Sequence, residues 1–311
     1  MTDLRPEFAA AYQRQTDAYF TARSRYWKNL YEDISLYGTI HQERRAIALA
    51  WISELAPPQA SHILEVGCGA GLLAVELARR GYIVTAIDSS EGMVELALAH
   101  AAEAGVHERL TVSISDAHAL PFPTASYDLV IALGVIPWLH SPAAALTEMA
   151  RVVKPDGFVL FNSDNRFRLN HVIDPWFTPV LAPLKQVAKR IALKLGYAER
   201  GAPNHYYSYT TLERLLADVG LVITRCRALG FGPFSLFGRQ LLPEAVSVGV
   251  HRRLQDLADR GTPVLRSTGA QHIILASRSE SGPAQAVSQG PEIARSCGPA
   301  PAGPRDRPAR G

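Results

Sequence analysis

The stretch from Ile63 to Ala78 constrains the fold of this chain more than any other. It reads Ile-Leu-Glu-Val, then Gly-Cys-Gly-Ala-Gly, then a run whose apolar residues recur at helical spacing. This order predicts a short buried strand, a glycine turn and a helix. Gly67, Gly69 and Gly71 can adopt backbone angles closed to other residues, and they let a ligand lie against the main chain. The free N–H groups at the start of the helix would face that ligand.

The spacing of these glycines bears on the kind of nucleotide that the turn would bind. The dinucleotide fingerprint G-x-G-x-x-G requires a third glycine where this chain has Leu72. The run here is E-x-G-x-G-x-G instead. A nicotinamide-dependent oxidoreductase therefore remains an alternative, but Leu72 counts against it.

An acidic residue follows the second predicted strand. Residues 83–87 are continuously apolar except for one threonine, and Asp88 comes directly after them. Asp88 lies about twenty residues beyond the first glycine, which is the spacing at which a carboxylate meets a ribose. The alternative is that Asp88 caps the helix expected over 91–104, a role for which Ser89 and Ser90 compete.

Two later phrases carry a resemblance to a known family. Asp116 and Ala117 follow the third predicted strand and open the string D-A-x-x-L-P-F, and residues 151–158 read R-V-V-K-P-D-G-F. Together with the glycine turn, they resemble class I S-adenosylmethionine-dependent methyltransferases from Ile63 to Phe161. The resemblance implies that Asp116 and the Ala117 amide contact the adenine edge.

The resemblance also implies a fold and a cofactor. The expected fold is α/β, with a seven-stranded, mostly parallel Rossmann-like sheet, helices on both faces, an N-terminal helical cap and a helical insertion after the fifth strand. The expected cofactor is S-adenosylmethionine. The residues expected to bind it are Glu65, Gly67, Cys68, Gly69, Gly71, Asp88, Ser89, Met93, Asp116, Ala117, Leu133 and Gly134.

The flanking segments divide the chain into three parts. Residues 1–58 form the predicted helical cap, 59–279 the cofactor-binding domain with its insertion at about 165–207, and 280–311 a tail whose Gly, Pro, Ala and Ser composition is typical of disorder. Within the insertion, the pattern of residues 184–195 predicts a basic amphipathic helix. That helix could contact a membrane surface peripherally, cover a lipophilic substrate or simply pack on the domain. Aromatic and basic side chains expected near the substrate are Tyr19, Tyr26, Trp27, Arg45, Trp138 and Tyr206, although such aromatics can equally anchor the cap.

These features predict a methyltransferase that acts on an O, N or C atom of a small, lipophilic or lipid-linked acceptor. His140 is the first candidate for a general base, because it follows the fourth strand and an imidazole titrates near neutral pH. His205, Tyr206, Asp164 and His41 are weaker candidates. A non-catalytic S-adenosylmethionine-binding module is a further alternative.

The composition of the chain limits the classes of partner that we expect it to bind. The net charge is only +3 and no block of lysine and arginine occurs, which argues against nucleic acid as a partner. The three cysteines are too scattered for a disulfide framework or a metal knuckle, and no cluster has metal-ligand spacing, so no metal is expected. The first residues lack an apolar signal segment and no apolar run approaches the roughly 20 residues of a membrane span. A cytoplasmic location is therefore expected.

Overall fold

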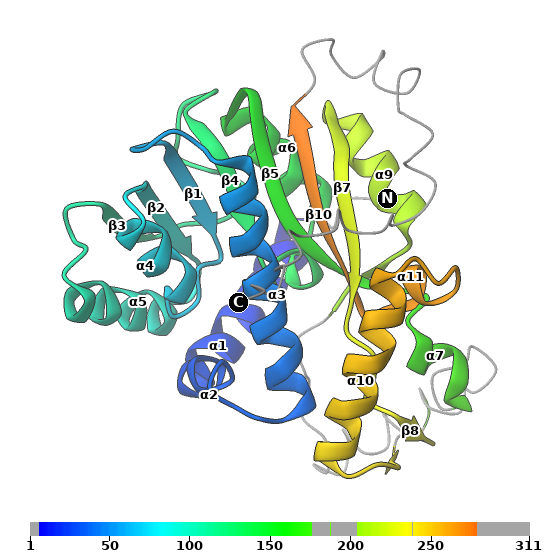
Figure 1. Ribbon diagram of the computed structural model, residues 1–311. Helices are drawn as coiled ribbons and strands as arrows, with labels where there is room; N and C mark the ends of the chain where they lie inside the picture. Colours follow the sequence, from blue (N-terminus) through cyan, green and yellow to red (C-terminus); the bar gives the residue numbers. More distant parts are fainter. Residues whose placement is uncertain (1–5, 176–186, 188–203, 238, 279–311) are drawn as a thin grey trace, which may run out of the picture.

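A single mixed sheet forms the centre of the molecule. The computed structural model describes residues 6–175, 187, 204–237 and 239–278, and its sheet runs in the order β3-β2-β1-β4-β5-β10-β7 (Figure 1). The first five strands in this order are parallel, and β10 is antiparallel to both β5 and β7. The predicted seven-stranded, mostly parallel α/β sheet is confirmed. The strands are β1 His62–Val66, β2 Ile83–Asp88, β3 Leu110–Ile114, β4 Tyr127–Ala132, β5 Val153–Asn165, β7 Leu221–Leu229 and β10 Gln271–Arg278, and the short β6 Tyr206–Tyr207 pairs with the end of β5.

Helices cover both faces of the sheet because neighbouring strand residues point to opposite sides. Ile63 belongs to the core under α3, α4 and α5, whereas the next residue, Leu64, belongs to the core under α6 and α9. Ile273 and Ile274 divide between the two cores in the same way. The helices are α3 Leu36–Leu55, α4 Leu72–Arg79, α5 Glu91–Ala104, α6 Pro142–Val152 and α9 Tyr209–Asp218.

Two local features shape β5 and α9. Within β5, the pairing with β4 shifts irregularly after Val153, and Asp156 has a φ of 63°, so residues 154–157 form a bulge inside the strand. Helix α9 begins at Tyr209, and Ser208 caps it, because the Ser208 hydroxyl accepts a hydrogen bond from the Thr211 amide.

The segments before β1 and after β7 meet beside the sheet. The helical cap consists of α1 Pro6–Ala22, α2 Ser24–Asn29 and α3, as predicted from the sequence. After β7 come the hairpin β8 Ser235–Leu236 and β9 Arg239–Gln240, then α10 Glu244–Asp259 and α11 Leu265–Thr268. Helix α10 lies alongside α3 in Figure 1.

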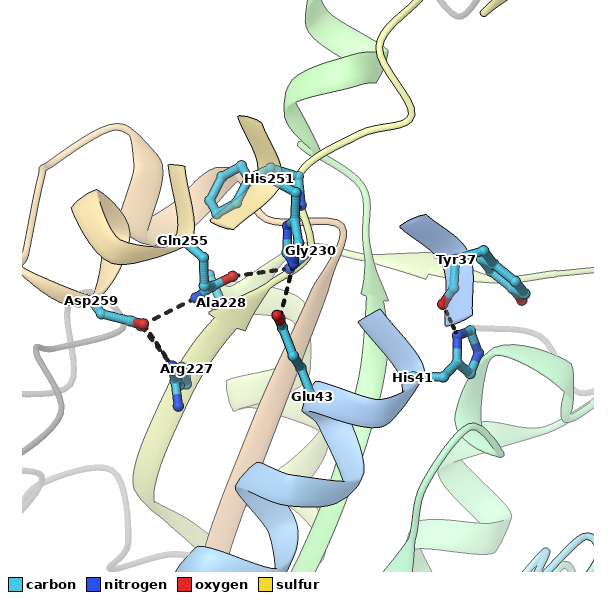
Figure 2. A network of polar contacts seen from close by, with 10 residues as sticks. Tyr37, His41, Glu43, Arg227, Ala228, Gly230, His251, Gln255 and Asp259 are labelled. Carbon is cyan, nitrogen blue, oxygen red and sulfur yellow. Dashed lines mark hydrogen bonds and ion pairs between the residues drawn. The ribbon is translucent and has the colours of Figure 1, made fainter. Parts of the chain in front are cut away.

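Polar contacts fix α3 to α10. The fully buried His251 accepts a hydrogen bond at Nδ1 from the Phe231 amide over 3.1 Å. Its Nε2 therefore carries the proton and donates to Glu43 on α3 over 2.9 Å (Figure 2). At the start of α3, the Leu36 amide donates to Glu244 over 3.0 Å. These contacts hold α3 at two points along its length.

Some predicted segments are not described by the structure. The basic helix expected at 184–195, apart from residue 187, and the tail at 280–311 lie outside the described residues, as does much of the insertion. Within the described ranges, no helix combines the length and the apolar character that crossing a bilayer requires.

Candidate cofactor and acceptor site

A cavity of about 530 Å³ opens at the carboxyl ends of the parallel strands. Parallel α/β sheets place ligands at this edge, because the loops that follow the strands meet there. All the residues expected to bind the cofactor line this cavity except Gly71. The α3 helix and the loops after β4 and β5 complete the walls.

The three glycines of the turn have different tasks. Gly69 has a φ of 55°, and a side chain built there would meet nothing within 4 Å, so its Cα faces open space in the cavity wall. Gly67 has a φ of 65° and packs against Val135 so closely that a Cβ would collide with it. Gly71 lies outside the cavity lining, contrary to the prediction. Gly71 is the N-cap residue of α4 and has a φ of 75°. A Cβ added at Gly71 would lie 2.9 Å from the Cβ of Ala97 on α5.

Asp88 holds the glycine turn and retains capacity for a ligand. One carboxylate oxygen accepts from the Gly69 amide over 2.9 Å, and the other accepts from the Ser90 amide over 2.9 Å. A carboxylate has about four acceptor positions, so about two remain for ribose hydroxyls. The alternative of a helix cap is not met, because Ser90 is the N-cap residue of α5. Burial raises the pKa of Asp88, and hydrogen bonds from the backbone oppose that rise.

Glu65 is a buried carboxyl with an unmet oxygen. Its side chain accepts a hydrogen bond from the Ala74 amide in the first turn of α4, while Oε2 has no partner among the described residues. Burial raises the pKa of Glu65 to about 8. A buried carboxyl that lines a cavity with one oxygen free is suited to a cationic ligand group.

Just after β3, Asp116 contacts His118, and His140 stacks on that histidine. Its Oδ1 accepts from the His118 amide over 2.9 Å and lies 2.6 Å from His118 Nδ1. This contact lowers the pKa of Asp116. The His140 ring stacks on His118 with centroids 3.7 Å apart, and His140 does not line the cavity. The structure thus places His140, the first candidate base, against His118 and outside the cavity lining.

Asp116, His118 and His140 also form a group that could hold a metal ion, because their ligand atoms lie within 4.8 Å of one another. Sequence spacing did not reveal it, since the residues come from two different loops. Both nitrogens of His118 are already engaged, by Asp116 and by the Ser141 amide at 3.3 Å. We therefore assign no metal to this group.

Arg44 is the main site residue that sequence reasoning missed. It is 5% exposed, lines the cavity and packs its guanidinium against Gly134 at the end of β4. One nitrogen donates to the Tyr31 hydroxyl over 3.3 Å, and the buried Nε has no partner among the described residues. A detectable signal was present, because Arg44 falls on the stripe Leu36, Ile40, Arg44 and Ala48, whose members are all buried.

One turn before Arg44, His41 faces the same cavity. Its Nδ1 donates to the Tyr37 carbonyl over 2.9 Å, which leaves Nε2 unprotonated (Figure 2). Burial, with the nearby Arg44, lowers the pKa of His41 to about 3. His41 is therefore a neutral imidazole at neutral pH, and it is the only histidine among the described residues of the lining.

The expected substrate residues divide into two groups. Trp27, Arg45, Trp138 and Tyr206 line the cavity. Tyr19 does not, because it stacks on Trp138 from outside with centroids 6.0 Å apart, and Tyr26 is 52% exposed outside the lining. For these two tyrosines, anchoring of the cap is the better interpretation.

The donor set of the cavity fits S-adenosylmethionine. Glu65 matches an ammonium, Arg44 a carboxylate, Asp88 two ribose hydroxyls and the bare Gly69 backbone a ligand in close contact. With the strand order of the sheet, this site defines a class I S-adenosylmethionine-dependent methyltransferase domain. Residues 64–161 match the family model described as a methyltransferase domain.

Relatives of known name support the same class. A ubiquinone biosynthesis O-methyltransferase of Paracidovorax citrulli is 37% identical over 124 residues, which cover 40% of this chain and 52% of that protein. The chain spans about half the length of the curated relatives it matches.

Solved structures share the fold. Magnesium protoporphyrin IX methyltransferase of Synechocystis, crystallised with bound SAH, has a TM-score of 0.56 and 19% identity, covering 84% of this chain and 97% of that one. The [4+2]-cyclase SpnF has a TM-score of 0.50 and 20% identity, covering 75% and 80%. At these identities the likeness shows the fold alone, and the two names belong to different reactions.

Proposed function

We propose that the protein transfers the methyl group of S-adenosylmethionine to an O, N or C atom of a small, lipophilic or lipid-linked acceptor. The observation that carries the proposal is the continuity of the cavity. The same space is lined by Gly69 and Asp88 at one end and by the aromatic side chains of Trp27, Tyr37 and Tyr206 at the other. Donor and acceptor can therefore occupy it together, side by side.

The residues of the cofactor end would bind and orient the donor. Asp88 would accept from the ribose, Asp116 and Ala117 would meet the adenine, and Glu65 and Arg44 would hold the amino acid portion. S-adenosylmethionine supplies a methyl group already activated on a sulfonium. The main contribution of the protein is then alignment of donor and acceptor, together with exclusion of water.

The named relatives point to an oxygen acceptor on a ring. The partial match to ubiquinone biosynthesis O-methyltransferases agrees with an aromatic, isoprenoid-linked hydroxyl compound, and the aromatic lining would suit such a ring. A hydroxyl must lose its proton during transfer. His41 would orient that hydroxyl by accepting its hydrogen bond at Nε2, because its Nδ1 is committed to the Tyr37 carbonyl. The proton itself would leave to solvent, because burial lowers the pKa of His41 too far for the imidazole to hold it.

The test is transfer of label from methyl-labelled S-adenosylmethionine to lipid and metabolite extracts of the source organism. We expect a labelled small molecule with the wild-type protein and none with Asp88→Ala, which should not retain the cofactor. Asp218→Ala, a change on α9 outside the cavity lining, serves as the matched control and should label normally. Tight cofactor binding without labelling of any fraction would reject methyl transfer.

A second candidate function is a reaction other than methyl transfer at the same site. This alternative is retained because the [4+2]-cyclase SpnF has the same fold, while its name describes a reaction other than methyl transfer. In that event the extract assay would show consumption of a metabolite without incorporation of label.

A further inference from the structure

The acceptor end of the cavity is built on one side of the sheet. In the strand order, Asp88 on β2 and the glycine turn after β1 come first, and β5 lies beyond β4. Asp164 lies one residue before the end of β5, and Tyr206 on β6 pairs with it in the sheet. Arg168 precedes α7 Leu169–Ile173. With Asn204, these three residues form what we call the acceptor wall, and all four line the cavity.

The acceptor wall contains buried polar atoms that have no hydrogen-bond partner among the described residues. Asn204 Nδ2 donates to Asp164 over 3.0 Å, but Asn204 Oδ1 is buried and has no such partner. Arg168 lies over the Tyr206 ring, 4.4 Å from its centroid, and its Nε is likewise buried without a partner in this part of the chain. No carboxylate in the described part of the chain forms an ion pair with Arg168. Because unpaired buried donors are unfavourable, this wall is incomplete without a ligand.

The balance of charge favours an anionic ligand. Arg168 and Arg44 both lie close enough to Asp164 to lower its pKa, yet burial prevails and leaves that pKa raised. Asp164 is thus a single carboxyl close to two guanidiniums. The cofactor adds a sulfonium to the same space, while Arg44 would be occupied by its carboxylate. An ammonium acceptor would meet like charge here, whereas an acid would pair with the guanidinium of Arg168.

The shape of the site selects among anions. A guanidinium offers parallel N–H donors that match the two oxygens of a carboxylate. The neighbouring walls are aromatic, with Trp27 and Tyr37 on the cap and Tyr206 beneath Arg168. Resting on the proposed methyl transfer, we propose that the acceptor is an aromatic carboxylic acid whose carboxylate is bound by Arg168, with Asn204 accepting a hydrogen bond from a ring hydroxyl.

The experiment measures binding of matched acids and amides by calorimetry. The protein is first saturated with S-adenosylhomocysteine, and then 4-hydroxybenzoate is compared with 4-hydroxybenzamide, and 6-hydroxy-2-naphthoate with its amide. Each pair has the same shape and differs in charge. The variants are Arg168→Met and Arg168→Lys. Arg166→Met is the control, since Arg166 is exposed two residues away and does not line the cavity.

We expect wild-type protein and the Arg166→Met variant to bind at least one acid about tenfold or more tightly than its amide. Arg168→Met should reduce this preference to within about threefold, and Arg168→Lys should fall between because it keeps the charge but loses the paired donors. Unchanged S-adenosylhomocysteine binding in both variants would show that they are folded.

Three results would overturn the inference. They are equal binding of acid and amide to the wild type, failure of every acid to bind at millimolar concentration, and a preference that survives in Arg168→Met. If S-adenosylhomocysteine itself does not bind, the proposed function falls and this inference falls with it. Acid-selective binding lost in Arg168→Met, with S-adenosylhomocysteine bound normally, would support both.

Discussion

Replacement of Glu65 by glutamine tests the cofactor end of the cavity most directly. Burial raises the pKa of Glu65 to about 8, so at pH 7 about nine-tenths of the ligand-free molecules carry a proton on it. An ammonium placed against the free Oε2 would favour the ionised carboxylate. Cofactor binding at pH 7 should therefore release close to one proton. Glutamine has the same shape but no proton to release.

The same shift has a consequence for stability, and its sign can be worked out. Between the ordinary pKa of about 4.5 and the folded value of about 8, the folded protein holds a proton that the unfolded chain has lost. Glu65 therefore costs no stability below pH 4.5 and progressively more as pH rises to 8, by roughly 4 kcal/mol in total. In Glu65→Gln this pH-dependent loss should be absent from the unfolding free energy.

Two measurements check these expectations. Titration calorimetry with S-adenosylhomocysteine at pH 7, in buffers of different ionisation enthalpy, gives the number of protons released. Denaturant unfolding at pH 5 and pH 8 gives the stability difference. The argument fails if wild-type protein releases no proton, or if Glu65→Gln releases as many as the wild type. An unfolding free energy with the same pH dependence in both proteins would refute the assigned burial of this carboxyl.

Three further substitutions probe the same crevice by calorimetry and thermal unfolding. Gly69→Val should abolish cofactor binding, because its side chain enters the open space, while the left-handed backbone costs about 1–3 kcal/mol of stability. Asp88→Ala should abolish binding and cost about 1–3 kcal/mol for each amide it leaves unpaired, at Gly69 and Ser90. Arg44→Met should weaken binding by roughly 10- to 100-fold, whereas Arg45→Met should change it little. Cofactor affinity equal to that of the wild type in any of the first three would contradict the role given to that residue.

The sheet and the glycine turn could be predicted because their determinants are local. The apolar run before Gly67 and the glycine that ends α5 at position 105 determine β1 and the end of that helix with little help from distant residues. Asp88 could be placed from spacing alone, since the length of a βα unit fixes where the second strand ends. In this part of the chain, the elements lie where the hydrophobic pattern and the residue spacing predict them.

The acceptor side could not be predicted because its residues meet only through tertiary packing. Arg44 is the exception, because its spacing from Leu36, Ile40 and Ala48 places it on the apolar stripe of α3. Arg168 and Asn204 come from opposite ends of a long insertion and meet across the end of β5. His118 and His140 likewise stack from separate loops, which places His140 outside the cavity lining.

The place of β10 in the sheet has a consequence for synthesis. Although it is the last strand that the structure describes, β10 lies between β5 and β7 and forms a ladder with each. A nascent chain released only to residue 270 would leave the facing edges of β5 and β7 unpaired, and such edges promote association with other chains. Gln271, the first residue of β10, accepts a hydrogen bond from Asn162 in the cavity lining and is synthesised after the rest of that lining. The pocket is therefore completed only when β10 has left the ribosome, and truncation before it should yield aggregation rather than a smaller active domain.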